Sequence, residues 1–155
     1  MAPQESKLTI RRFFTGLTEH AFHVRLGVAD PPLVEYLSEL LVRFVHVGEV
    51  YRVRTPTGKR LHQVVDMLEE ARARVGPAQR EVHRHIGDFT LFWVGLFPEA
   101  VEQMRRRSPK DRLVDYRQQG KQAYRRASSI PTERDDAPNE VLEQLSSEFE
   151  LCAYG

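Results

Sequence analysis

The segment from Glu81 to Glu99, EVHRHIGDFTLFWVGLFPE, constrains the fold more than any other part of the chain. It is long enough for a helix, and at about 3.6 residues per turn its apolar residues cover nearly the whole circumference. A helix that is apolar on every side is enclosed by other elements. We therefore expect a buried central helix over about residues 77–97, with His85 and Asp88 inside its apolar pattern.

Length and composition favour one soluble domain. A chain of 155 residues is long enough to bury a hydrophobic core without disulfide bonds or a structural metal. Apolar residues make up 41% of it and charged residues 29%, as in ordinary globular proteins. We expect a single helical domain over residues 1–155, and a formal net charge of +1 gives no bulk attraction to nucleic acid or to an anionic membrane.

Several features predict a cytoplasmic location. The one cysteine, Cys152, has no partner for an internal disulfide bond, and the first residues, MAPQESKLTIRR, lack the basic and then apolar pattern of an export signal. The longest apolar run, Ile86 to Phe97, contains Asp88 and is shorter than the roughly 20 residues that cross a membrane. We therefore expect no membrane segment.

Helical periodicity and capping signals predict about six helices. The first covers Thr9 to Leu26, with Phe13 and Leu17 on its apolar face, Gly27 as its C-terminal cap, and Gly16 as a point where it loosens or breaks. The second begins after Asp30-Pro31-Pro32, a capping acid followed by prolines at the first helical positions. The third has its apolar residues between Leu61 and Val75.

The second half of the chain continues this pattern. Pro98 closes or kinks the central helix, and further helices are expected over Glu99–Arg107, from Ser108-Pro109 to Ala127, and over Asn139–Tyr154 after an exposed loop at residues 128–138. The last of these has a continuous apolar face. We expect part of that face to be exposed as a partner surface.

Glu81, His85 and Asp88 are spaced four and three residues apart, so they share one face of the central helix. Carboxylates and imidazole are ligands for zinc, iron or manganese, and helical bundles build metal sites from such side chains. On the first predicted helix, His20 flanks the apolar face and is the best additional candidate. The alternative is that His85 and Asp88 are buried structural groups, hydrogen-bonded to each other or to the backbone.

Basic residues cluster between Arg105 and Arg126, and Arg117, Lys121 and Arg125 align along one helical ridge where they can contact anions. The following segment is acidic, so the two stretches can instead neutralise each other across a helical hairpin. A charge run alone is weak evidence for nucleic-acid binding.

One segment resembles a known group of proteins. The residues Arg84 to Phe89, continued by Leu91-Phe92 and by Gly95 to Glu99, are similar to an RHIGDFxLFxxGxFPE-like stretch of uncharacterised bacterial all-helical proteins. Phe149-Glu150-Leu151-Cys152 is similar as well. The resemblance implies a cytosolic bacterial helical protein and carries no activity or site residues.

No sequence motif indicates catalysis. The chain has no Gly-x-Ser-x-Gly elbow or glycine-rich phosphate loop, and Cys152 has no activating basic neighbour. We therefore expect a non-enzymatic protein that binds a protein partner or a second copy of itself, without a cofactor. The alternative is a metal- or small-ligand-binding helical protein, including an enzyme, that uses the cluster of Glu81, His85 and Asp88 with His20.

Overall fold

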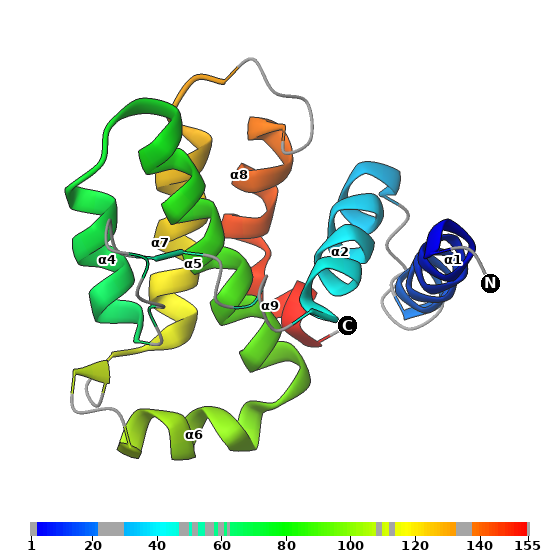
Figure 1. The fold of residues 1–155 in the computed structure, drawn as a ribbon, viewed down its shortest axis with the longest axis horizontal. Coiled ribbons are helices and arrows are strands. Elements are labelled where there is room, and N and C mark those ends of the chain that lie inside the picture. The colour runs from blue at the N-terminus through cyan, green and yellow to red at the C-terminus, as the bar shows by residue number, and fades with distance from the viewer. Residues whose placement is uncertain are drawn as a thin grey trace. The chain divides into compact units, whose positions relative to one another are not determined.

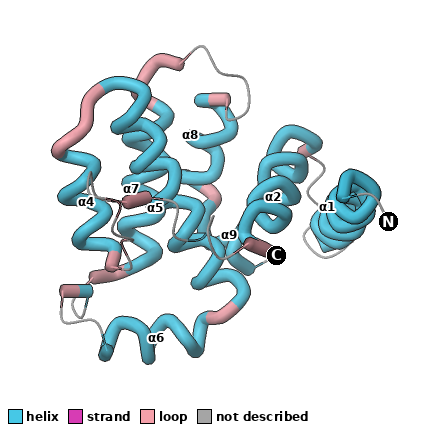
Figure 2. Tube along the Cα trace, viewed as in Figure 1, coloured by secondary structure: helices cyan, strands magenta, loops and turns pink. Residues whose placement is uncertain are grey.

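The computed structural model describes residues 3–21, 30–46, 50, 53–54, 58, 61, 63–107, 110–111, 114–132 and 138–154. Eight α-helices make up most of this part of the chain, and none of its residues lies in a strand (Figures 1 and 2). The predicted all-α fold is confirmed. No described helix is long and apolar enough to span a membrane.

The chain divides into two compact units, residues 1–50 and residues 51–154. The first contains α1 (Pro3–His20) and α2 (Pro31–Phe44), and the other six helices belong to the second. The single domain expected over residues 1–155 stays a prediction.

In the first unit, α2 forms as predicted and α1 differs. The Asp30 carboxylate caps α2 by accepting a hydrogen bond from the backbone N–H of Leu33 at 3.2 Å. Helix α1 begins earlier than expected and runs through Gly16 without a break. Phe13 and Leu17, which were predicted to form its buried face, are 60% and 49% exposed. The predicted end at Leu26 and its cap at Gly27 lie outside the described residues.

The second unit is built around α5 (Gly76–Leu96), which confirms the predicted central helix. Helix α5 contacts α4 (Val64–Arg72), α6 (Pro98–Arg107), α7 (Tyr116–Ser128) and α9 (Phe149–Tyr154), and α8 (Asn139–Ser147) packs on α7. Side chains with no exposed surface come from all of these helices except α6: Val64, Met67, Ala71, Val82, Ile86, Phe89, Ala123, Tyr124, Ala127, Leu142, Leu145 and Phe149.

Glycines let neighbouring helices approach α5 and α7. A Cβ atom on Gly87 would lie 2.6 Å from the Tyr124 ring, and one on Gly120 would overlap Thr90 and Phe149. At Gly95, the backbone oxygen of Ala153 in α9 lies 3.3 Å from the position that a Cβ would take. Gly87 and Gly95 of α5 therefore pack closely against two different helices, α7 and α9.

The end of α5 and the break between α8 and α9 were predicted with different success. Helix α5 ends before Phe97, whose backbone is not helical (φ −134°, ψ 57°), and Pro98 begins α6, so Pro98 closes the central helix. The continuous C-terminal helix was predicted wrongly, because it is interrupted at Glu148 between α8 and α9. Its apolar face is buried and forms no exposed partner surface: Val141, Leu142, Leu145, Phe149 and Cys152.

Helix α4 is capped by a residue far away in the sequence. The preceding residue, Gln63, makes no capping bond. Instead the buried carboxylate of Asp111 accepts hydrogen bonds from the N–H groups of Val64 at 2.7 Å and Val65 at 3.0 Å, and from the Tyr116 hydroxyl at 2.9 Å. Helix α7 starts at Tyr116 with Asp115 as its cap, and the predicted Ser108-Pro109 start lies outside the described residues.

We expect Gly87→Ala to destabilise the second unit. The new methyl group overlaps the Tyr124 ring, and overpacking of about 1–3 kcal/mol exceeds the roughly 1 kcal/mol that alanine gains over glycine in a helix. Urea unfolding followed by fluorescence of Trp93, the one tryptophan, measures the change. Gly16→Ala is the control, because its Cβ meets nothing within 4 Å and should stabilise α1 in thermal unfolding followed by circular dichroism. A Gly87→Ala protein as stable as the parent would contradict the close contact.

Candidate functional site

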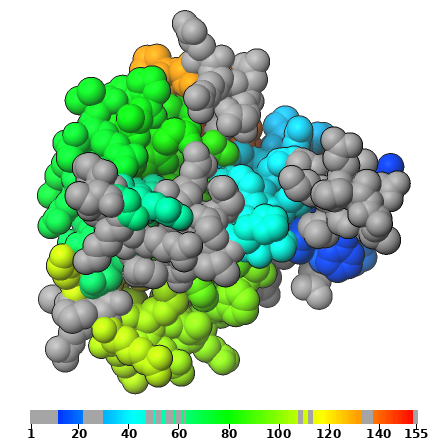
Figure 3. Space-filling model, in the orientation of Figure 1, coloured from blue at the N-terminus to red at the C-terminus, as the bar shows by residue number. Residues whose placement is uncertain are grey.

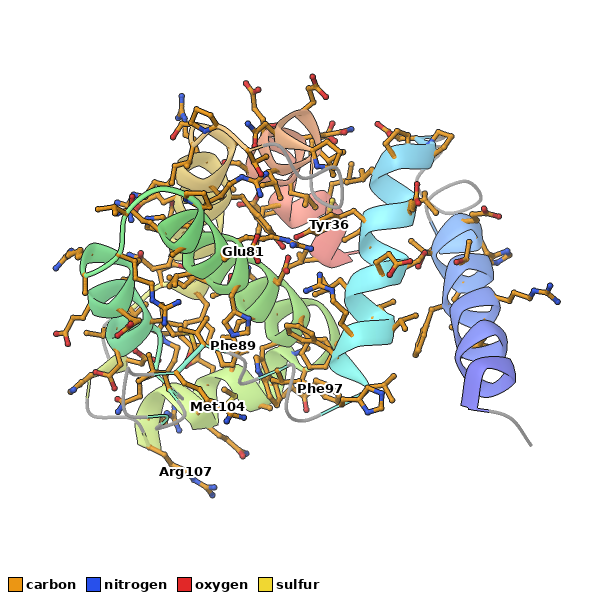
Figure 4. The ribbon with its side chains drawn as sticks, turned by 45° about the horizontal axis from the view of Figure 1, so that its top comes forward. Tyr36, Glu81, Phe89, Phe97, Met104 and Arg107 are labelled. Carbon is orange, nitrogen blue, oxygen red and sulfur yellow. The ribbon has the colours of Figure 1, made fainter. Side chains whose placement is uncertain are left out.

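The predicted cluster on α5 lies partly in the core of the second unit. His85 and Asp88 are buried, whereas Glu81 is half-buried. Figure 4 shows Glu81 toward one end of α5, Phe89 in its middle and Phe97 just beyond its other end. The three predicted ligands therefore lie along one helix, with Glu81 half-buried and the other two in the core.

Asp88 is held by a residue that the sequence analysis missed. The Tyr124 hydroxyl of α7 donates a hydrogen bond to Asp88 Oδ1 at 2.6 Å. Arg84 Nε lies 3.9 Å from Asp88 Oδ2 one turn earlier on α5. The partner expected for Asp88 was His85 or the backbone, and the structure places a tyrosine and an arginine beside it.

Glu81 also lies among arginines. Its Oε1 is 3.7 Å from Nη1 of Arg84 and 3.9 Å from Nη1 of Arg80. Arg80 is buried and donates from Nη2 to the Asn139 side-chain oxygen of α8 at 2.7 Å. Two buried guanidinium groups thus stand beside two carboxylates, so the charges on this face of α5 balance.

This arrangement is suited to holding helices together. Each carboxylate of the predicted cluster has a cationic side chain within 4 Å, and Asp88 also accepts from a tyrosine. Among the described residues, no three His, Cys, Asp or Glu side chains are grouped as metal ligands. The geometry favours a structural role for Glu81 and Asp88.

His20 does not share the buried surroundings of His85. It is exposed at the end of α1, in the first unit. Phe13 and Leu17, on the predicted apolar face that His20 flanks, are exposed as well.

The basic ridge of α7 is partly neutralised by the last helix. Lys121 forms an ion pair with Glu150 of α9, and this hydrogen bond lowers the pKa of the Glu150 carboxyl group. Arg117 and Arg125 are exposed. The predicted hairpin neutralisation therefore exists at Lys121.

His83 is a buried imidazole that was given no role. Its Nδ1 has no hydrogen-bond partner among the described residues. Burial lowers the pKa of His83 from its ordinary value of about 6.5, and the nearby Arg126 charge lowers it further. Burial and the Arg126 charge therefore favour the neutral form of His83 in the folded protein.

A second candidate site is an exposed group of apolar side chains where α5 ends, which we call the apolar corner: Phe92, Trp93, Leu96 and Phe97. Leu96 and Phe97 are 52% and 47% exposed, and Phe92 and Trp93 are half-buried. The Phe97 ring centroid lies 5.4 Å from that of Trp93 and 5.9 Å from that of Phe92. Sequence periodicity placed these residues in the core and so did not indicate a surface.

A small cavity lies between the end of α5, α6 and the start of α7. Its volume is about 100 Å³, and its lining is mixed: Val94, Pro98, Val101, Glu102, Arg105, Asp115, Tyr116 and Arg117. Arg105 is paired with Glu102 at 2.9 Å, and the Asp115 carboxylate caps α7. Glu102, Arg105 and Asp115 therefore already have partners within the fold. A cavity of this volume has room for a few waters or one small side chain.

Comparison with protein families, with curated protein sequences and with solved structures finds no match for this chain. The resemblance to bacterial helical proteins stays a prediction.

We expect Tyr124→Phe to destabilise the second unit by about 1–3 kcal/mol, because it removes a hydrogen-bond donor from the buried Asp88 carboxylate. Urea unfolding followed by Trp93 fluorescence measures the loss. The loss should shrink when Asp88→Asn is already present, since the acceptor is then uncharged. An equal loss in both backgrounds would show that the hydroxyl acts independently of Asp88.

We expect the second unit to lose stability in mild acid because of His83. Its pKa is lower in the folded than in the unfolded protein, so its contribution is intact above about pH 6.5 and is lost as the pH falls through the folded-state pKa. Unfolding free energies at pH 7.5, 6.5 and 5.5, as test conditions, should fall less steeply in His83→Gln than in the parent. His46→Gln, which removes an exposed imidazole, is the control. Parallel curves for the parent and His83→Gln would refute the assignment.

Proposed function

We propose that this chain is a non-enzymatic association module that binds a second copy of itself through the apolar corner. The observation that supports this proposal is the exposure of Leu96 and Phe97 next to the half-buried rings of Phe92 and Trp93. Contiguous aromatic and aliphatic side chains on a surface are typical of protein interfaces, and aromatic residues supply much of their binding energy.

The position of the corner suits this role. It lies where α5 gives way to α6, at a proline-containing turn, so its side chains are carried on a helix end that the core holds in place. Figure 3 shows α6, in yellow-green, along the lower edge of the second unit in this view. Because Phe97 directly precedes α6, we infer that a partner bound at the corner also contacts the start of α6.

A second copy is favoured over another protein by the charge of α6. Its first turn carries Glu99 and its last turn carries Arg105, Arg106 and Arg107. A surface with both signs of charge at opposite ends is complementary to itself when one copy is reversed. The corner and α6 together therefore offer apolar area and matching charge.

The alternative, a metal- or ligand-binding protein that uses Glu81, His85 and Asp88, has weaker support. Asp88 is bonded to Tyr124, and Glu81 lies beside two arginines, so both carboxylates already have protein partners. Anion binding along α7 is likewise weakened by the pairing of Lys121 with Glu150.

We expect Leu96→Ser and Phe97→Ser to reduce self-association by at least about tenfold in the dimer Kd, since each removes apolar area from the corner. Sedimentation velocity over a range of concentrations up to several hundred micromolar measures this. Val75→Ser is the matched control, because Val75 is 83% exposed in the same unit but lies outside the corner.

Leu17→Ser tests a competing surface, because Leu17 is 49% exposed beside Phe13 on α1. A parent protein that stays monomeric, or association that is lost only in Leu17→Ser, would overturn the proposal. Circular dichroism of each variant verifies that its helices are retained.

A further inference from the structure

Helix α6 presents an exposed face whose charged residues at either end form no ion pair with the described residues. Its buried side chain is Val101, and residues on the opposite side are exposed, including Glu99, Gln103 and Arg106. Glu99, Arg106 and Arg107 form no ion pair within the described part of the chain, in contrast to Glu102 and Arg105, which pair with each other. The exposed face is therefore acidic at its start and basic at its end.

We propose that two copies pair through antiparallel α6 helices, with Glu99 of each copy facing Arg106 of the other. This inference rests on the proposed self-association and specifies its geometry. Residues 99 and 106 are equally far from the helix midpoint between residues 102 and 103. A twofold axis through that midpoint exchanges them, so one axis creates two identical Glu99–Arg106 contacts.

The same axis places the apolar corner of one copy near the basic end of α6 in the other copy. Phe97 directly precedes α6 and Arg107 ends it, so reversal of one copy places the two residues at nearly the same level along the helix axis, about one residue apart. A guanidinium group over an exposed aromatic ring is a favourable contact. The corner thus meets a group that it can bind.

The two parts of this interface have different energetic roles. Exposed ion pairs contribute about 0–1 kcal/mol each, so the apolar corner must supply most of the affinity. The charges select the antiparallel orientation and disfavour the parallel one, which would place like charges together. Helix α6 is only about 15 Å long at 1.5 Å per residue, so the interface is small and the dimer is weak and salt-sensitive.

The same charges also stabilise α6 by themselves. An acidic first turn and a basic last turn complement the helix dipole, at about 0.3–1 kcal/mol for each group. A test must therefore separate pairing between copies from stability within one helix. Exchanging the two charges does so, because the exchange reverses the favourable dipole arrangement but preserves the contact between copies.

The experiment measures the dimer Kd by sedimentation equilibrium for the full chain, Glu99→Arg, Arg106→Glu and the double variant Glu99→Arg/Arg106→Glu. Each single reversal turns two attractive contacts into repulsive ones, so we expect the Kd to rise at least about tenfold. The double variant should return to within about threefold of the parent. Arg125→Glu, an equal charge change at an exposed position of α7, is the control and should leave the Kd unchanged.

The outcomes separate this inference from the function on which it rests. Recovery in the double variant supports the antiparallel α6 pair. A parent that dimerises with the same Kd as all the α6 variants, or a double variant weaker than both single variants, overturns the α6 geometry and leaves self-association standing. A parent that does not dimerise at several hundred micromolar overturns both.

Discussion

The second unit depends on the contact between α5 and α7. Gly87 on α5 leaves room for the Tyr124 ring, and Gly120 on α7 leaves room for Thr90 and Phe149. At this depth the Tyr124 hydroxyl reaches the Asp88 carboxylate, which is buried and needs hydrogen bonds there. The packing of Tyr124 against Gly87 therefore both fills the space between α5 and α7 and supplies a hydrogen bond to the buried Asp88 carboxylate.

Local signals predicted several of the helices well. Asp30 with its two prolines marks the start of α2, and Pro98 separates α5 from α6, because capping and backbone restriction act within a few residues. The interruption at Glu148 has no such local signal, since the apolar spacing continues through it. Phe149 packs over Gly120, a contact that depends on the tertiary structure.

For the candidate site, the burial of His85 and Asp88 was predictable and their partners were not. Arginine is normally placed on the surface, so Arg80 and Arg84 were passed over, although both fall at four-residue spacings before Asp88. The four-residue spacing of Arg80, Arg84 and Asp88 does place them in one row along a single helix face, and this pattern could have been read from the sequence. Tyr124 and Asn139 could not be assigned, because they reach the row only through the packing of α7 and α8 on the same core.

The cap that Asp111 places on α4 links two parts of the chain that have no sequence proximity. The first amide groups of α4 are satisfied from 46 and 47 residues away. Loss of Asp111 from this position would leave the first N–H groups of α4 and the buried Tyr116 hydroxyl without their acceptor. The start of α4 and the start of α7 therefore share one acceptor, and we expect the amide protons of Val64 and Val65 to become exchangeable in the same opening event that frees the Tyr116 hydroxyl.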